Sequence, residues 1–389
     1  MSSASRESFV FAIEDEFAVT PSAKEGDSQL RWFVPPPGSW FTSSHSRSVN
    51  SIYEVGRKRL TDYNYGKISG TWQWSFVLDY NYLEPFLLVF EDYAYNDYQT
   101  TVDQTGSLVW ADWGVHTFKK NETDTVRSFS VMRKRLHRVA GGVADEVIVY
   151  NGCVCTTLSL TQANTTSEVR VTMSGVYSTE TMDSDAELDG LDIIDSKSPK
   201  LVAFGCVYNG STMMTNVQNW EIRIGNNVKA IYGVGYPAMR SYFENESAYS
   251  FSLTAFANNP KQLAQRVYSG GYRNDLNTPI REGALPIPVI DLKSRSEAIQ
   301  RFPAGVQDEG AVTPTGEYSE LRYAMDIHIV NCTVNAMTWT ASQGERLLDK
   351  LSNGGCEYME FKFVNMFPRS YLAEDYGDAA WDKHIYPPY

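Results

Sequence analysis

The side chains best suited to metal binding or nucleophilic catalysis are few and scattered in this sequence. The five histidines are His45, His116, His137, His328 and His384. None of them stands at a metal-ligand spacing from another histidine or from a cysteine. The five cysteines are Cys153, Cys155, Cys206, Cys332 and Cys356. Their odd number argues against a disulfide framework, and Cys153-Val-Cys155 is one residue too short for a C-x-x-C pair, so we expect free structural thiols.

Sequence motifs of known enzyme classes are absent. The chain has no Walker A loop, no HExxH, no GxSxG and no dinucleotide fingerprint. Carboxylates are abundant enough that a glycosidase-type pair stays open. The 9 Trp, 24 Tyr and 18 Phe would suit a carbohydrate groove, strand cores or a protein interface equally well. We expect no enzymatic activity, no metal site and no cofactor.

The charge balance bears on the possible partners. With 34 Lys and Arg against 47 Asp and Glu, the formal net charge is −13. Such a chain is not expected to grip nucleic acid or an anionic membrane through a basic face. No apolar run approaches the ~20 residues that span a bilayer, and the first residues lack the pattern of a secretory signal. We therefore expect synthesis in a cytoplasm and no membrane partner.

The sequence contains an internal repeat. Residues 49–56 (VNSIYEVG) and 228–235 (VKAIYGVG) both fit V-x-x-I-Y-x-V-G, at an offset of 179, and a tryptophan precedes each copy at an offset of 180. The signature positions are Trp40, Val49, Ile52, Tyr53, Val55 and Gly56 in the first copy and Trp220, Val228, Ile231, Tyr232, Val234 and Gly235 in the second.

Two more blocks follow in the same order. Trp74-Ser-Phe76 matches Tyr249-Ser-Phe251 at an offset of 175, and residues 146–161 match 326–340 with one gap. Four blocks in one order near one offset predict two copies of one fold. We place a first β domain at residues 1–180, an acidic linker at 181–197 and a second β domain at 198–389.

Each unit is expected to be mainly β. Segments rich in β-branched and aromatic residues, several of them alternating apolar and polar, predict strands. They lie at residues 71–78, 147–150, 169–173, 221–224 and 361–364. The predicted architecture is α+β or mainly β: two tandem β-sandwich or barrel units, each with a flanking α-helix.

Helices are expected where the WSF and YSF strands end. In the first copy the candidate is 82–93, with Asn81 as N-cap, and in the second it is 260–268, with Asn259 as N-cap. A third candidate, 345–351, is found only in the second copy.

Three segments break the strand pattern. Residues 27–40 contain Pro35, Pro36 and Pro37 and are expected to form a rigid surface loop or arm. Residues 273–317, with Pro286 and Pro288, are expected to be a long irregular insertion that contacts another subunit. The third is the acidic linker.

A basic cluster, Arg57-Lys58-Arg59, follows the first signature block. Because the chain as a whole is acidic, we interpret this cluster as a contact with an acidic neighbouring subunit, for example with its linker.

Further short patterns complete the picture: EDEFAVTPS near the N-terminus, the Asn151–Cys155 hairpin and VQNWEIRIGNNV at 217–228. With the V-x-x-I-Y-x-V-G block and the WSF strand that leads into a helix, they resemble the tail tube (major tail) proteins of long-tailed, siphovirus-type bacteriophages. The resemblance covers most of the chain outside the linker and the 273–317 insertion. It rests on pattern and order.

The resemblance implies a structural virion protein. Members of that family form stacked rings around a channel that conducts the viral genome into the host. Each ring is built from β-sandwiches with a flanking helix and a loop that contacts the next ring. Forms with two fused domains make pseudo-sixfold rings of three chains, and the duplication implies that form here. The implied partners are other copies of the chain, the terminator, distal tail and tape measure proteins, and duplex DNA in non-specific passage. The implied location is the virion tail.

Alternatives from other classes stay open. Another ring-forming tail component, such as a terminator, distal tail or baseplate protein, would share related sandwiches. A carbohydrate-binding β-sandwich is supported only by the aromatic and acidic residues.

Candidate channel-lining residues come from the polar positions of alternating strands. They are Gln73 and Ser75 in the first copy and Asp326 and His328 in the second. Because DNA must slide through such a channel, we expect an acidic lining. The alternative is that these side chains simply face solvent.

Overall fold

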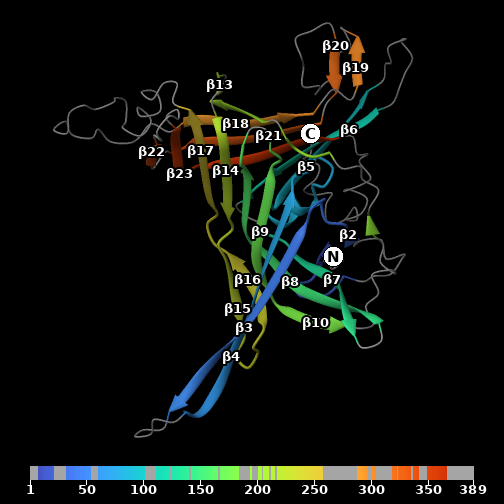
Figure 1. Ribbon diagram of the computed structural model, residues 1–389, viewed down its shortest axis with the longest axis vertical. Coiled ribbons are helices and arrows are strands. Elements are labelled where there is room, and N and C mark those ends of the chain that lie inside the picture. The colour runs from blue at the N-terminus through green and yellow to red at the C-terminus, as the bar shows by residue number, and fades with distance from the viewer. Residues whose placement is uncertain are drawn as a thin grey trace, which may run out of the picture.

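A computed structural model shows a mainly β molecule, as the sequence predicted (Figure 1). It describes residues 8–21, 32–53, 60–100, 111–121, 125–139, 142–164, 167–183, 193–194, 200–203, 205–209, 212–214, 217–256, 287–296, 300–303, 318–321, 323–333, 336–340 and 348–365.

The largest sheet has 13 strands and contains strands from both halves of the chain. Its strands are β1 (Ser8–Ile13), β2 (Trp32–Phe33), β3 (Trp40–Tyr53), β4 (Leu60–Val77), β7 (Ser128–Val139), β8 (Gly142–Gln162), β9 (Arg170–Tyr177), β10 (Thr179–Asp183), β11 (Ile193–Ile194), β14 (Val217–Gly225), β17 (Ala248–Phe256), β22 (Ala336–Thr340) and β23 (Leu348–Gly355). Eight of them are neighbours in the order β3-β4-β9-β8-β14-β17-β23-β22.

A second sheet of 7 strands also combines the two halves. Its order is β13 (Thr212–Met214), β12 (Gly205–Asn209), β18 (Ile287–Arg295), β21 (Ala324–Cys332), β24 (Tyr358–Asn365), β6 (Ala111–Lys119) and β5 (Asp92–Thr100). Two separate two-stranded ribbons are β15 (Val228–Tyr232) with β16 (Met239–Glu244), and β19 (Gln300–Pro303) with β20 (Tyr318–Leu321). The long β3–β4 hairpin projects from the body at the lower left of Figure 1, and the β15–β16 ribbon lies toward the same end.

Strand β8 connects two parts of the large sheet. Its first part pairs with β7 and β10, whereas its last part pairs with β9 and β14. Between these parts Gly152 has a φ of 65°, a left-handed conformation that glycine adopts without steric cost. A Cβ at this position would also lie 2.8 Å from Ser178 Cβ and 2.9 Å from the Phe17 ring.

The same strand registers occur in both halves, at the offset of 179. Phe41 faces Trp74 in the β3–β4 pair, and Trp220 faces Leu253 in the β14–β17 pair. The correspondence includes an irregularity, since the register shifts between Ile52 and Tyr53 and again between Ile231 and Tyr232. Three further pairs recur at this offset. Ser44–Thr71 corresponds to Arg223–Ser250, Val49–Tyr65 corresponds to Val228–Glu244, and Met182–Ile148 corresponds to Phe361–Ile327.

Two residues related by this offset also share a left-handed backbone conformation. Asn331 is the counterpart of Gly152 at this offset, and it has a φ of 52°. The β4–β9 and β17–β23 pairs share their register only at one end. Thr71 faces Val176 and Ser250 faces Gly355, but beyond this point the second pair slips by one residue.

The core lies between the two sheets and is rich in aromatic rings. Trp74, Phe76, Phe90, Phe118 and Phe361 are fully buried in one cluster. Rings of the first half contact rings of the second: Phe90 lies 5.0 Å from Phe361 between ring centroids. Burial of such rings is the largest stabilising term available to the chain.

The predicted strands are confirmed, but the predicted helices are not. Residues 71–78, 147–150, 169–173, 221–224 and 361–364 fall on β4, β8, β9, β14 and β24, Leu78 and Val169 lying just outside the strand bounds. In place of a helix at 82–93 there is only a 3-10 turn, η1 (Glu84–Leu88), which begins after Leu83 rather than Asn81. Its residues are all buried, so close packing on every side replaces the one-sided burial of an amphipathic helix.

The helix predicted at 345–351 is wrong over 348–351, while 345–347 lie outside the described residues. Leu348–Gly355 form strand β23, which pairs with β17 and β22, so its backbone groups are bonded across the sheet. The candidate at 260–268 lies outside the described residues.

The three irregular segments are more ordered than expected. In the 273–317 segment the described residues 287–295 and 300–303 form β18 and β19, and Ile290 and Leu292 are buried in the core, so the prediction of an irregular insertion is wrong over these residues. In 27–40, Trp32 and Phe33 are buried. The linker 181–197 overlaps β10 and contains β11. In the described ranges, no helix is sufficiently long and apolar to cross a membrane.

Candidate functional site

Six strands of this run, β3, β4, β9, β8, β14 and β17, share one mostly polar side, which we call the hydroxyl face. Because cross-strand partners point to the same side of a sheet, the registers define its members. They are Trp40, Thr42 and Ser44 on β3, Thr71, Gln73, Ser75 and Val77 on β4, Arg170, Thr172, Ser174 and Val176 on β9, Thr157, Ser159 and Thr161 on β8, Asn219, Glu221 and Arg223 on β14, and Ser250, Ser252 and Thr254 on β17. Most of these residues are serine or threonine.

This face follows from strict alternation along each strand. In β9 the side chains alternate between half-buried or exposed and fully buried, and Val171 and Met173 lie in the core. In β14, Ile222 and Ile224 are buried, whereas Glu221 and Arg223, which alternate with them, are exposed. The period of two therefore separates an apolar layer from a hydroxyl layer on the same strands.

Hydroxyl groups on this face bond to one another across the strands. Ser44 Oγ lies 2.9 Å from Thr71 Oγ1, and Ser75 Oγ lies 3.1 Å from Thr172 Oγ1. Such cross-strand pairs stabilise the sheet modestly and orient the hydroxyls. The result is a surface rich in hydroxyl groups.

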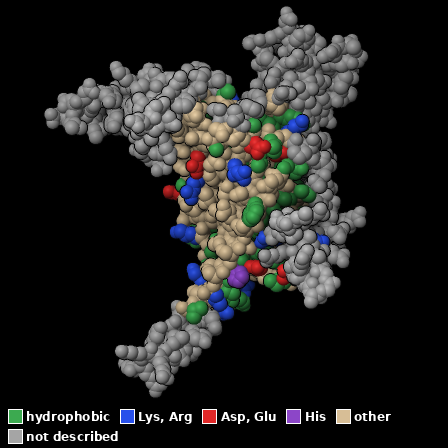
Figure 2. Space-filling model, viewed as in Figure 1, with side chains coloured by type: hydrophobic (Ala, Val, Ile, Leu, Met, Phe, Trp, Pro, Cys, Tyr) green, Lys and Arg blue, Asp and Glu red, His purple; other side chains and the backbone are tan. Residues whose placement is uncertain are grey.

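Charged side chains are sparse on the hydroxyl face. Its members include only Arg170, Glu221 and Arg223, and Ser159 donates a hydrogen bond of 3.4 Å to Glu221. The described part of this face is therefore not acidic. Figure 2 shows one side of the molecule on which charged side chains are scattered among uncharged polar atoms and backbone.

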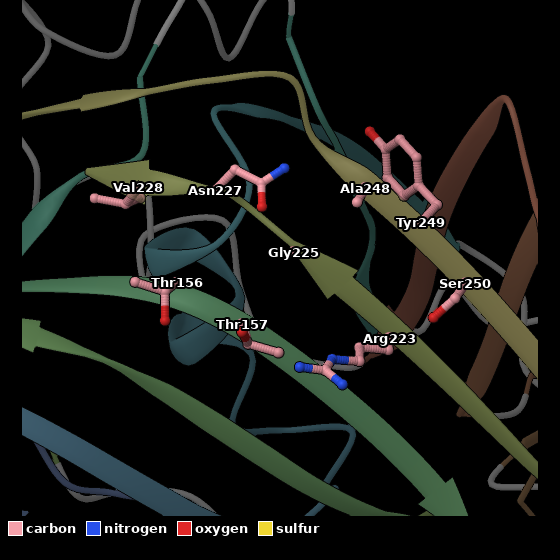
Figure 3. A pocket seen from close by; sticks show the side chains of 9 residues that line it. All are labelled: Thr156, Thr157, Arg223, Gly225, Asn227, Val228, Ala248, Tyr249 and Ser250. Carbon is pink, nitrogen blue, oxygen red and sulfur yellow. The ribbon is translucent and has the colours of Figure 1, made fainter. Parts of the chain in front are cut away.

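A shallow depression of about 450 Å³ lies at the junction of β8, β14 and β17 (Figure 3). Arg223 faces Ser250 of β17 across the strands, and Thr157, Asn227 and Tyr249 also line the depression. Figure 3 shows the guanidinium of Arg223 lying toward Thr157. The depression offers hydrogen-bond donors but no nucleophile with an adjacent base, so its geometry does not support covalent catalysis.

The cysteines are reduced and chemically inert where they are buried. All five are free. Burial raises the pKa of Cys155 to about 12, and burial also raises the pKa of Cys332 to about 12, so both are protonated thiols at neutral pH. Among the described residues there is no group of three or more His, Cys, Asp or Glu side chains that could hold a metal ion.

A buried ion cluster joins the two halves. Lys120 Nζ donates to Glu91 and, at 2.8 Å, to Glu244 of β16, and also to the Val89 carbonyl oxygen at 3.2 Å. The Lys120 side chain is 7% exposed. Burial, opposed by the charge of Lys120, raises the pKa of Glu91.

The four candidate lining residues lie on two different sheets. Gln73 and Ser75 are on the hydroxyl face, whereas Asp326 and His328 lie on β21 of the seven-stranded sheet. His328 Nδ1 lies 2.5 Å from Asp291 Oδ1 on β18. The structure therefore does not bring the four together. The register counterparts of Gln73 and Ser75 are Ser252 and Thr254, which the constant offset of 179 would have identified.

The candidate interface residues are placed differently from one another. Pro36 is buried and Pro35 and Pro37 are half-buried against their own chain. Ser39 Oγ donates to the Pro36 carbonyl at 2.6 Å, so this segment forms a turn packed on the body. Pro288 lies on β18, while Pro286 and the cluster Arg57, Lys58 and Arg59 lie outside the described residues.

The repeat signature falls on equivalent hairpins, with one correction. Val49, Ile52 and Tyr53 lie on β3, and Val228, Ile231 and Tyr232 lie on β15. Val234 and Gly235 follow β15 in a turn, and Val55 and Gly56 lie outside the described residues.

The tryptophan match at an offset of 180 is wrong as an equivalence. The registers align Phe41, not Trp40, with Trp220. Accordingly Trp40 is 70% exposed, whereas Trp220 is 4% exposed. The WSF and YSF blocks are likewise out of phase, since Trp74 corresponds to Leu253 and not to Tyr249.

The chain matches no protein-family model and no curated protein.

Proposed function

We propose that this chain is the structural subunit of a viral tail tube. In this proposal copies of the chain close into rings, the rings stack, and the resulting bore conducts the genome into the host. The chain has no catalytic role and needs no cofactor. Its partners are other copies of itself and the proteins at the two ends of the tube.

The observation that carries the proposal is the hydroxyl face. Neighbouring strands from both halves present serine and threonine to solvent, with few charges. DNA affinity grows with each phosphate that a Lys or Arg neutralises. A surface of hydroxyls is wetted by water without gripping phosphates, which is what sliding DNA requires.

The recurrence of the strand registers supports the form with two fused domains. The two halves share strand pairing, a register irregularity and a left-handed residue at one offset. We infer that they are copies of one unit. Three chains would then supply six units to a ring.

Electron microscopy of the purified full chain over a range of concentrations tests the proposal. Hollow filaments with a bore wide enough for a duplex are the expected result. Discrete rings that never stack would favour a terminator or another ring-forming tail component. Single chains that are retained on a polysaccharide resin would favour a carbohydrate-binding module.

A second measurement addresses the face itself. Wild-type polymer is expected to bind duplex DNA weakly, as measured by filter binding at several salt concentrations. Gln73→Lys and Ser252→Lys, which occupy equivalent positions, should each strengthen binding and steepen its salt dependence. The control is Ser241→Lys, at an exposed position on β16 of the separate β15–β16 ribbon, outside the hydroxyl face. Equal strengthening by all three variants would contradict the role of this face.

A further inference from the structure

The two halves of the chain meet along two strand pairs. In the large sheet β8 of the first half pairs with β14 of the second, and in the seven-stranded sheet β6 of the first half pairs with β24 of the second. The first half thus covers two strand edges of the second half. Behind β6, Phe86 and Phe90 lie 5.9 and 5.0 Å from the Phe361 ring.

The first half has the same two edges, and within the described part of the chain both are open. At the offset of 179, β3 corresponds to β14 and β10 corresponds to β24. Among the strands described, β3 pairs with β4 alone and β10 with β8 alone. Unpaired edges of this length invite pairing with another chain.

Exposed apolar side chains mark both open edges. Met182 on β10 is 70% exposed, while its counterpart Phe361 on β24 is 0% exposed because the first half covers it. Trp40 on β3 is 70% exposed. Large apolar groups on an open strand edge are typical of an interface that is filled in the assembly.

The strand that would fill the β3 edge is present at the other end of the same sheet. The last part of β8, which pairs with β14, corresponds at the offset of 179 to β22. Among the described strands β22 pairs only with β23. The eight-strand run therefore has β3 at one end and β22 at the other, each with one open edge among the described strands. Their counterparts at the offset of 179, β14 and β8, pair with each other in the middle of the run.

We propose that a second copy of this chain docks on the first half. It contacts the first half in the same way as the first half contacts the second half within one chain. Strand β22 of one copy pairs antiparallel with β3 of the next, in the register of β8 with β14. The predicted partners are Thr42 with Thr340, Ser43 with Trp339, Ser44 with Thr338, His45 with Met337, and Ser46 with Ala336. The incoming copy also covers β10 and Met182. This inference rests on the proposed function, because the partner is the next subunit of the ring.

A second copy fits these edges better than an unrelated protein. The contact is head-to-tail and repeats the β8–β14 and β6–β24 pairing that the two halves already make within one chain. A head-to-tail contact repeated with a fixed rotation closes into a ring, and closure leaves no open edge.

Cysteine cross-linking tests the register. In a background where the partly exposed Cys206 and Cys356 are serine, the matched pair is Ser44→Cys with Thr338→Cys in the full chain. After mild oxidation we expect covalent species of more than one chain on a denaturing gel, ending at three chains if the ring is trimeric. Directly opposed strand residues have the Cα separation that a disulfide requires.

The chain supplies two controls of matched geometry. Ser159→Cys with Arg223→Cys is the equivalent pair inside the chain, since Arg223 faces Ser159, and it should close within single chains. Thr42→Cys with Thr338→Cys is displaced by two residues and should cross-link far less.

The outcomes separate this inference from the proposed function. If electron microscopy shows tubes while the matched pair stays open and the internal control closes, the register is wrong and the tube role stands. If the matched pair cross-links in rings that never stack, the interface stands and the tube role falls. If the protein stays single-chained at all concentrations and the matched pair stays open, both are overturned.

The β10 edge has its own test. Met182→Asp should weaken assembly at least tenfold, measured as the concentration at which sedimentation detects polymer, and should leave the melting temperature of the dilute single chain unchanged. Val234→Asp, at a fully exposed apolar residue in the turn after β15, which belongs to neither edge strand, is the matched control. Equal assembly of Met182→Asp and wild type would overturn the assignment of β10.

Discussion

Strands β10 and β24 have the same place in their respective halves and opposite surroundings. Both pair with a long neighbouring strand in the same register, so Met182 and Phe361 stand at equivalent positions. Rings of the first half cover Phe361, whereas Met182 is exposed to solvent. The same local design therefore gives a core residue in one half and a surface residue in the other.

The difference shows that one half is completed by its neighbour within the chain and the other is not. Strand β24 gains β6 as an additional partner, and β14 gains β8. Strands β10 and β3 gain none among the described residues. Burial in this molecule thus depends on which half a strand belongs to as much as on its own sequence.

Substitution of the two equivalent residues should show the largest contrast. Phe361→Ala is expected to lower the free energy of unfolding by about 3–5 kcal/mol, because it empties a ring-lined core site. Met182→Ala should change it by less than about 0.5 kcal/mol in dilute single chains. Urea denaturation followed by tryptophan fluorescence measures both. Similar losses at the two positions would contradict the comparison.

Lys119 and Lys120, which are neighbours in the sequence where the two halves meet, give the next contrast. Lys120→Ala should cost about 3 kcal/mol, because Glu91 and Glu244 are left buried without their cation. Lys119 pairs with Asp92 at 3.2 Å on the surface, and Lys119→Ala should cost no more than about 1 kcal/mol. The same denaturation experiment compares them, and a cost for Lys119→Ala as large as that for Lys120→Ala would argue against the buried cluster as the junction of the halves.

The equivalent left-handed residues should differ by a smaller amount. Gly152→Ala is expected to cost about 2 kcal/mol, because its φ of 65° and the nearby Phe17 ring both oppose a Cβ. Asn331→Ala should cost about 1 kcal/mol. Asn331 also donates a hydrogen bond to Glu357, so Asn331→Gly serves as the control that removes this bond without strain. Thermal melting of the three variants provides the measurement.

The smallest expected effect is a pH dependence of stability caused by Glu91 in the buried ion cluster. Burial raises the pKa of Glu91 above its ordinary value of 4.5, so the folded chain binds more protons than the unfolded chain just above pH 4.5. This contribution to stability is present at low pH and is lost as the pH rises through the folded pKa. The stability difference between wild type and Glu91→Gln should therefore fall as the pH is raised from 4.5 toward neutrality. A difference that rises instead would contradict the direction of the shift.

Much of the strand content could be predicted from local pattern. Segments such as 169–173 and 221–224 alternate apolar and polar residues, and alternation places one side in a core wherever the strand pairs. The helix errors have a common cause, because they used spacing and capping signals over short segments. Residues 84–88 are buried on all sides, and residues 348–355 find strand partners, so tertiary context overrode propensity in both places.

The candidate site was predicted in part. Gln73 and Ser75 were found because they are polar positions of an alternating strand, and the other members of the hydroxyl face could have been found by extending that rule to β8, β9, β14 and β17. Asp326 and His328 could not be assigned to a sheet in this way. The equivalent of β8 in the second half is divided into β21 and β22, and alternation does not reveal where a strand changes sheets.

By itself the sequence determined the mainly β class, the period of two along the strands and the internal repeat with its nearly constant offset, because these depend on residues close together in the chain and on the comparison of one segment with another. Only the tertiary structure decided which strands become neighbours across the halves, and hence that Phe361 is covered while Met182 is not. Strand neighbours are chosen by packing between segments far apart in the sequence, where loop closure and burial compete, and no local pattern encodes that choice.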